Sequence, residues 1–115
     1  MSDEQRDKLV LKKIVRYCDE AGEMAVQCGN TEEAFLNDRT SRYAIAMCLM
    51  QIGELSGRLS DEARCQMSVI SWNMIRGMRN ILAHDYVNVD WNTIWKTVVM
   101  DLPALRLVCD NYLKG

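Results

Sequence analysis

The chain has 115 residues, the size of one domain, and its 49% hydrophobic and 26% charged content is that of a globular protein with a real core. A net charge of −2 and a pI near 5.4 argue against coating nucleic acid through a broad basic surface, so any phosphate binding must be local. Eight methionines, one proline and no regular series of β-branched runs predict an all-α fold, an antiparallel bundle of four to five main helices forming a single domain over residues 1–115.

The amino-terminal half predicts one long helix and one short one. Apolar residues at spacings of three and four indicate an amphipathic helix over residues 4–28, ended by Gly29-Asn30. Thr31, followed by two glutamates, is a candidate N-cap for a short helix reaching about Leu36.

Asn37-Asp38 is predicted to begin a second long helix, the central one. Every residue from Tyr43 to Met50 is apolar, so we expect this helix to be covered nearly all round, by its neighbours or by a second subunit. The same environment, core or dimer interface, is expected for four methionines: Met47, Met50, Met74 and Met78.

Three further cap candidates organise the rest of the chain. Ser60 is predicted to cap a brief helix, Ser71 to cap a helix ending near residues 83–84, and Asp90 to cap the last helical stretch. Because Pro103 lacks an N–H and disfavours α geometry at Leu102, we expect a kink or break near residues 101–102.

Cysteine usage and the absence of a leader indicate the compartment. The five cysteines are odd in number and form no C-x-x-C pair, so we expect buried free thiols, and with one histidine we expect no metal site. No apolar leader segment and no run of about 18 apolar residues is present, which predicts a cytoplasmic protein without membrane association. The cysteines are Cys18, Cys28, Cys48, Cys65 and Cys109.

The only histidine, His84, follows an arginine by five residues and precedes a tyrosine by two. In one helix over residues 72–84, steps of about 100° place four polar side chains within roughly 140°: Arg76, Arg79, Asn80 and His84. The opposite, core-facing arc is filled by Met74, Ile75, Met78, Ile81 and Leu82. Because no carboxylate occurs in this segment, its polar face suits a phosphate.

Histidine and arginine together fit metal-independent cleavage of RNA, in which a base activates the ribose 2′-hydroxyl and an acid protonates the leaving 5′-oxygen. The reaction needs two proton-transfer groups, so a histidine-only mechanism requires two copies of His84 facing each other in a homodimer. Arg79 would then hold the scissile phosphate. The alternative is a solvated polar face with a histidine at a helix end.

Residues 41–115 resemble the HepT-like branch of the HEPN superfamily in the order and spacing of several stretches. They are Gln51-Ile52-Gly53-Glu54 before Leu59-Ser60, the run Trp72-Asn73-Met74-Ile75-Arg76-Gly77-Met78-Arg79-Asn80, His84-Asp85-Tyr86, Val89-Asp90, Trp95, and Asp101-Leu102-Pro103. The resemblance implies a dimeric all-α ribonuclease, the toxin of a prokaryotic toxin–antitoxin pair, that needs no cofactor.

The family's R-x4-6-H motif falls on Arg79 and His84, with Asn80 as the polar residue after the arginine. Its extended R-x4-H-x-Y form adds Tyr86, and the resemblance implies that a minimal nucleotidyltransferase of the MntA type attaches AMP to this tyrosine and neutralises the toxin. The added bulk and negative phosphate would block RNA beside Arg79. The alternative for Tyr86 is a partly buried tyrosine whose hydroxyl bonds locally.

Supporting residues are less specific. Glu54 matches the family's Gly-Glu pair and either orients Arg79 or Arg76 across the bundle or forms a structural ion pair, while Gly53 is expected to allow close helix approach. Arg42 and Arg76 are candidates to extend the phosphate-binding surface, or are solvated arginines.

A second reading of the whole chain is a non-catalytic module that binds a nucleotide or a nucleotidyltransferase. Asp85 bears on the choice, because a carboxylate beside His84 would either steady the imidazolium or repel RNA.

Overall fold

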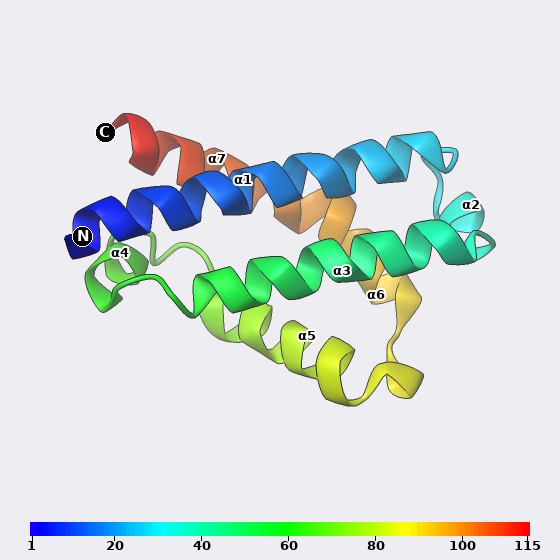
Figure 1. Ribbon diagram of the computed structural model, residues 1–115. Coiled ribbons are helices and arrows are strands. Elements are labelled where there is room, and N and C mark those ends of the chain that lie inside the picture. The colour runs from blue at the N-terminus through cyan, green and yellow to red at the C-terminus, as the bar shows by residue number, and fades with distance from the viewer.

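The computed structural model describes residues 1–115 and consists of helices without strands, which confirms the predicted all-α fold (Figure 1). The four long helices are α1 (Asp3–Gln27), α3 (Arg39–Ser56), α5 (Trp72–His84) and α7 (Leu102–Lys114). Shorter segments are α2 (Glu32–Leu36), α4 (Asp61–Gln66), the 3₁₀ turn η1 (Tyr86–Asn88), α6 (Trp91–Lys96) and the π-helical turn η2 (Thr97–Asp101).

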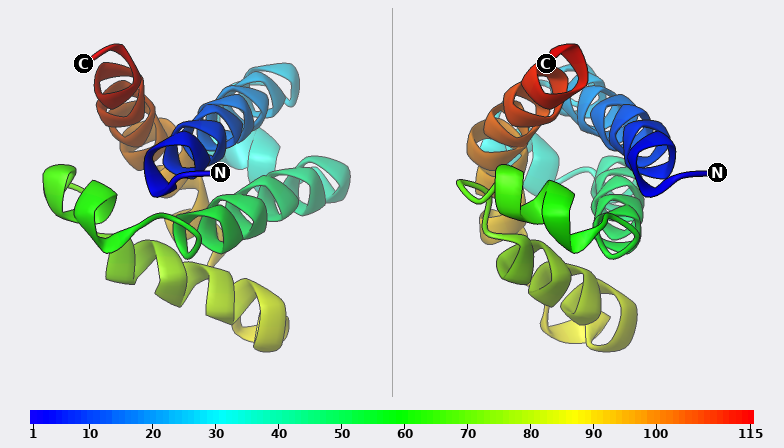
Figure 2. Two further views of the ribbon diagram at one scale, coloured as in Figure 1. Left: turned by 60° about the vertical axis from the view of Figure 1, so that its left-hand side comes forward. Right: turned by 90° about the vertical axis from the view of Figure 1, so that its left-hand side faces the viewer.

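Successive long helices alternate in direction, and α3 lies between α1 and α5 (Figures 1 and 2). Helix α7 packs against α1, so that α1, α3, α6 and α7 enclose most of the apolar core. Among the long helices, α5 packs substantially against α3 alone. One side of α5 therefore faces away from the bundle. None of the helices combines the length and the apolar character needed to cross a lipid bilayer.

Three of the four predicted caps are confirmed, and Asp38, where we predicted the start of the central helix, is also a cap. Side-chain oxygens accept hydrogen bonds from free N–H groups in the first helical turns at Thr31, Asp38, Ser60 and Asp90. The prediction for Ser71 is wrong. Its φ of −82° and ψ of 84° are those of an inverse γ-turn, closed by the Trp72 N–H bonding to the Ile70 carbonyl, and its hydroxyl caps nothing in α5.

We predicted a kink or break near residues 101–102. The helix is not broken there, because the chain passes Pro103 through a widened turn. Leu102 keeps α geometry, with φ −65° and ψ −40°, and its N–H donates to the carbonyl of Thr97 five residues back. Pro103 then falls in the first turn of α7, where its missing N–H costs little. The π turn accommodates Pro103 without interrupting the helix.

The central helix α3 is less covered than predicted. Tyr43 is 53% exposed and Met47 54% exposed, so the other helices of this chain do not enclose the apolar run. Coverage by a second subunit stays a prediction. Of the other grouped methionines, Met50 and Met78 pack against the core, whereas Met74 is exposed.

The cysteines divide by burial. All five are free thiols, as predicted, and Cys18, Cys48 and Cys109 are buried. The prediction of burial is wrong for Cys65, which lies exposed on the short α4, and Cys28 is only half-buried.

Candidate functional site

Helix α5 carries the predicted polar face, but Arg79 does not share the environment of its neighbours. Arg76, Asn80 and His84 are exposed, whereas Arg79 is partly buried and turned toward α3. The predicted apolar arc is only half covered: Leu82 is buried, but Met74 is 73% exposed and Ile81 is 47% exposed. The expectation that the whole arc faces the core is wrong, because no long helix other than α3 packs against α5.

Arg79 meets α3 at Gly53, where the two helices approach closely. A Cβ atom at residue 53 would lie 2.4 Å from Cβ and 2.8 Å from Cγ of Arg79, distances that no real methyl group tolerates. Glycine at residue 53 therefore allows the approach predicted from the sequence. It also fixes where Arg79 stands along α3.

The guanidinium of Arg79 is held on two sides. Its Nη2 pairs with the carboxylate of Glu54, and its Nη1 donates to Oδ1 of Asn80 at 3.1 Å. Of the two partners considered for Glu54, the structure therefore selects Arg79, and Arg76 makes no ion pair. Because the paired side chains are 30% and 42% exposed, the ion pair contributes only about 0–1 kcal/mol to stability. Its main effect is to orient the guanidinium.

The Nε–H of Arg79 is buried and makes no hydrogen bond. A buried donor that finds no partner in protein or water costs about 1–3 kcal/mol.

His84 is the last residue of α5, and its imidazole is exposed and free of hydrogen bonds and ion pairs. The neighbouring Asp85 does not contact it: the Asp85 carboxylate accepts a hydrogen bond from the side chain of Asn88 at 2.7 Å. The Asn88 N–H also donates to the Asp85 carbonyl, which closes the turn η1. Asp85 thus shapes the turn after the motif and leaves His84 accessible.

Tyr86 begins η1 and lies between two other aromatic rings. Its ring centroid is 5.9 Å from that of Tyr43 in α3 and 5.6 Å from that of Trp91 in α6. The side chain is 36% exposed, and its hydroxyl makes no hydrogen bond, unlike the locally bonded tyrosine considered as an alternative. Burial, and secondarily Tyr43, raise the pKa of the Tyr86 phenol, against a smaller opposite effect of Arg42. The phenol is therefore protonated at neutral pH.

Arg42 belongs to this aromatic group and not to the Arg79 site. Its Nη1 donates to the carbonyl of Leu36, and its guanidinium lies 5.7 Å from the ring centroid of Trp91. One N–H group and one face of the Arg42 guanidinium are thus already engaged within the protein. Arg42 lies near Tyr86. This position depends on contacts between α2, α3 and α6, so it could not be predicted from the neighbouring sequence.

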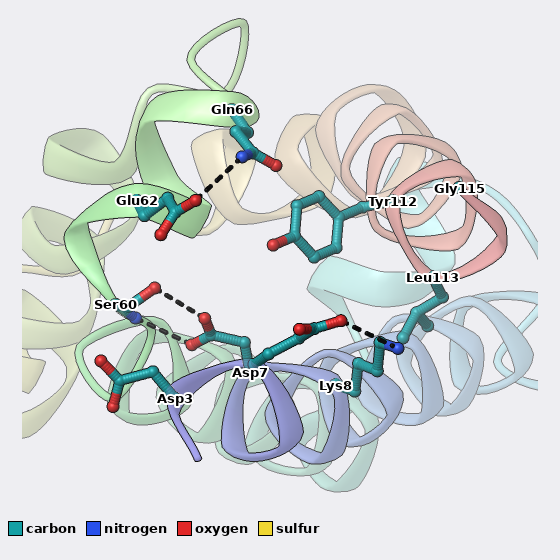
Figure 3. Close-up of a pocket in the computed structure, with 10 residues that line it drawn as sticks. Asp3, Asp7, Lys8, Ser60, Glu62, Gln66, Tyr112, Leu113 and Gly115 are labelled. Atoms are coloured by element: carbon teal, nitrogen blue, oxygen red, sulfur yellow. Dashed lines mark hydrogen bonds and ion pairs between the residues drawn. The ribbon is translucent and has the colours of Figure 1, made fainter.

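A pocket of about 450 Å³ lies at the opposite end of the molecule from the carboxyl end of α5 (Figures 1 and 3). It is bounded by the first turns of α1, by α4 and by the end of α7, and several carboxylates line it. The buried Asp7 accepts hydrogen bonds from the N–H and the hydroxyl of Ser60, at 2.8 and 2.6 Å, and so ties α1 to the start of α4. No predicted site residue lines this pocket, and no group of three or more possible metal ligands occurs in the structure.

A second, more apolar groove of about 390 Å³ separates α5 from α6 on the exposed side of α5. It lies on the same helix as Arg79 and His84. Its lining includes Met74, Met78 and Ile81, which we predicted to face the core, together with Val89 and Ile94.

Comparison with protein families decides the relationship. The model of the family described as "Ribonuclease HepT-like" matches residues 10–111. The chain belongs to the HepT-like ribonuclease family. The resemblance inferred from residues 41–115 is confirmed, and the match extends it through most of α1.

Three relatives have names that agree with this family. A Methanocaldococcus jannaschii protein named "Putative RNase" is 35% identical over 72 residues, which are 63% of this chain and 66% of that protein. A Thermococcus cleftensis protein named "Probable ribonuclease HepT" is 35% identical over 74 residues, 64% of this chain and 67% of that protein. A "Putative RNase" of Caldanaerobacter subterraneus subsp. tengcongensis is 35% identical over 78 residues, 68% of this chain and 70% of that protein. No solved structure matches significantly.

Within this HepT-like chain, the motif residues fall into two neighbouring groups. Arg79, Asn80 and Glu54 form a bonded cluster between α5 and α3. Tyr86 belongs to an aromatic cluster between η1, α3 and α6. His84 stands between them in sequence, at the end of α5, without a bond to either.

Proposed function

We propose that this HepT-like protein is a metal-independent endoribonuclease, with His84 as the acid/base, Arg79 as the phosphate clamp and Asn80 as a positioning group. The observation that carries the proposal is the fixed guanidinium of Arg79, held by Glu54 and Asn80 on the same helix as an exposed, unbonded His84. A positioned cation and imidazoles free to accept and donate protons are the groups that transesterification of RNA uses.

In the proposed reaction one imidazole accepts the proton of a ribose 2′-hydroxyl, and the resulting oxygen attacks the adjacent phosphorus. The bond from phosphorus to the 5′-oxygen breaks, and an imidazolium donates a proton to the leaving oxygen. The products are a 2′,3′-cyclic phosphate and a 5′-hydroxyl. Arg79 stabilises the negative charge that accumulates on the non-bridging oxygens, because its guanidinium donates parallel hydrogen bonds to phosphate.

The two proton transfers need two histidines, so we place the active site across a homodimer. Exposed apolar side chains on and after α5 support this arrangement: Met74, which lines the groove between α5 and α6, is 73% exposed, and Val87 in the turn η1 is 94% exposed. Apolar surface on the helix that carries His84 suits an isologous interface, which would bring the two motifs together.

Mixing wild type with an excess of His84→Ala protein tests the composite site. The mixed dimer keeps only one histidine, so the proposal predicts that it is inactive and that the excess variant suppresses wild-type cleavage. Wild-type activity that is unchanged by an excess of a His84→Ala chain able to form mixed dimers would contradict a site shared between chains. Sedimentation of the wild type as a monomer would contradict it.

We further propose that Tyr86 is the AMP acceptor for a partner nucleotidyltransferase of the MntA type, and that the protein is the toxin of such a pair. The Tyr86 hydroxyl is free of hydrogen bonds and lies two residues from His84, so a phosphate on it would stand in the motif. Because the pKa of the phenol is raised, the partner must supply the base that deprotonates it.

One observation favours the second candidate, a non-catalytic module that binds a nucleotide or a nucleotidyltransferase. Within a single chain nothing orients the imidazole of His84, whereas catalytic histidines are usually held by a hydrogen bond to their second nitrogen. A dimer in which the imidazole also stays unbonded, together with uncleaved RNA, would favour this candidate.

A further inference from the structure

A groove between α1 and α3 is lined by three cations and no carboxylate. Its volume is about 400 Å³. Arg6 and Lys13 come from α1, seven residues and therefore nearly two turns apart on one face, and Arg58 follows the end of α3. The floor is apolar and consists of Leu9, Val10 and Leu55.

The cations of this groove are largely free. Lys13 and Arg58 make no ion pair, and both are exposed. Arg6 contacts the exposed Asp3 at 2.9 Å through one nitrogen, a pair of the kind that contributes little energy. On a chain with a net charge of −2, two unpaired cations beside a third that is weakly paired make a local anion-binding surface.

Arg58 connects the groove to the Arg79 site. Arg58 lies in the turn after α3, four residues beyond Glu54, and its backbone N–H donates to the carbonyl of Leu55. Glu54, which pairs with Arg79, is followed directly by Leu55, which lines the groove. The Arg79 site and the groove therefore both adjoin the last turn of α3.

We propose that the RNA substrate continues from Arg79 across the end of α3 into this groove, where Arg58, Lys13 and Arg6 bind its phosphates. The apolar floor accommodates the face of a base, since Leu9 is 46% exposed there. This inference rests on the proposed ribonuclease function and assigns it a second phosphate-binding site. Single-stranded nucleic acid is commonly bound in a positively charged groove that follows its backbone, and here aliphatic side chains take the place of the aromatic ones on which bases usually stack.

RNA is favoured over a second copy of this chain as the occupant. The cations come from both sides of the groove and no carboxylate lines it, which suits the phosphates of a nucleic acid backbone. The acidic surface on this side lies further along α1, where Glu20 and Glu23 border a separate groove beside Met47. This acidic surface could pair with the basic groove of a second copy, so an interface between copies is the alternative outcome of the test.

The test measures binding of wild-type protein to a single-stranded oligonucleotide with 2′-O-methyl riboses, which the proposed reaction cannot cleave. The double variant Lys13→Gln/Arg58→Gln is compared with Lys12→Gln/Lys96→Gln, which changes the net charge equally through exposed, unpaired lysines outside the groove. We expect the groove variant to bind about tenfold more weakly. Its salt dependence should fall by roughly 1.4 log units per log unit of salt, about 0.7 for each lost phosphate contact.

Equal affinity of the two double variants for the oligonucleotide would overturn the proposal that the groove binds RNA, whether or not the protein is a nuclease. Unchanged RNA binding with an altered sedimentation coefficient in the groove variant would also overturn it and assign the face to contacts between copies. Cleavage of an all-ribose RNA is measured in parallel. If neither wild type nor any variant cleaves this RNA but the groove variant still binds the oligonucleotide more weakly, the ribonuclease proposal is wrong, whereas the groove is a nucleic-acid-binding site.

Discussion

Gly53 of α3 and Arg79 of α5 are in such close contact that a methyl group on residue 53 would lie 2.4 Å from the Cβ of the arginine. This contact sets the register of the two helices, and the ion pair between the adjacent Glu54 and Arg79 depends on that register. The position of the proposed phosphate clamp is thus determined by the absence of a side chain.

Gly53→Ala should destabilise the protein and abolish RNA cleavage. Replacing glycine by alanine within a helix favours folding by about 0.5–1 kcal/mol, but overpacking against a backbone-fixed Cβ costs about 1–3 kcal/mol, so the clash prevails. Gly22→Ala is the matched control, because a Cβ at Gly22 meets nothing within 4 Å. Urea denaturation should show a lower free energy of unfolding for Gly53→Ala and a higher one for Gly22→Ala. A stabilised, active Gly53→Ala protein would refute the close contact.

Glu54→Ala should lower the rate of RNA cleavage with little effect on stability. The ion pair with Arg79 is partly exposed, so its loss changes the free energy of unfolding by less than about 1 kcal/mol, whereas a misplaced guanidinium lowers kcat by roughly 10–100-fold. Glu54→Gln keeps an oxygen that accepts from Arg79 and should restore part of kcat. Kinetics and thermal melting of both variants check this. A rate loss that simply follows stability would assign Glu54 a structural role.

Much of the fold could be predicted from local sequence. Caps such as Thr31 and Asp90 act within three residues, and the end of α1 at Gly29-Asn30 follows from backbone conformations that both residues adopt at positive φ. The errors came where tertiary structure competes with local preference. Leu102 stays helical before Pro103 because a π turn upstream absorbs the mismatch.

The candidate site was predictable in its residues but not in its arrangement. The spacing of Arg79 and His84 is visible in the sequence, whereas the choice of Arg79 over Arg76 as partner of Glu54 depends on how α5 rotates against α3. Arg42 could not be placed, because its partners Leu36 and Trp91 come from elements that meet only in the folded chain. The apolar periodicity of α5 predicted more burial than the structure shows, because a sequence pattern does not reveal how many helices pack against a face.

Tyr86→Phe should prevent neutralisation by the nucleotidyltransferase while leaving the fold intact. The phenol makes no hydrogen bond, so its removal should change stability by less than about 0.5 kcal/mol, and the ring contacts with Tyr43 and Trp91 remain. Incubation with partner enzyme and ATP, read by intact mass, should add one AMP to wild type and none to this variant. Tyr43→Phe is the control and should still be modified. Addition of AMP to Tyr86→Phe would move the acceptor elsewhere.

The thiols should differ sharply in reactivity. Burial raises the pKa of Cys18 and Cys109 to about 12 and that of Cys48 to about 11, so these three stay protonated and inert toward alkylation at pH 8. Cys65 is exposed and should react first, and the half-buried Cys28 more slowly. Iodoacetamide labelling followed by peptide mass spectrometry checks the order. Fast labelling of the buried three in the native protein would contradict the packing of α1 against α3 and α7.

The buried thiols also predict how stability responds to alkaline pH. They ionise near 9 in the unfolded chain but only near 11–12 in the folded one, so unfolding releases protons and stability should decline as pH rises above about 9. Urea denaturation at pH 8 and pH 10 measures the decline, which should be smaller in a Cys18→Ala variant than in wild type. An equal decline in both would assign it to other groups.

The most direct test of the account is cleavage of a labelled RNA in excess EDTA by protein that intact mass shows to be unmodified, comparing wild type with His84→Ala and with Lys96→Ala as an unrelated surface change. We predict cleavage with a 2′,3′-cyclic phosphate end by wild type and Lys96→Ala, and none by His84→Ala. Equal cleavage by His84→Ala, or no cleavage of several RNAs by any of the three, would contradict the proposed role of His84.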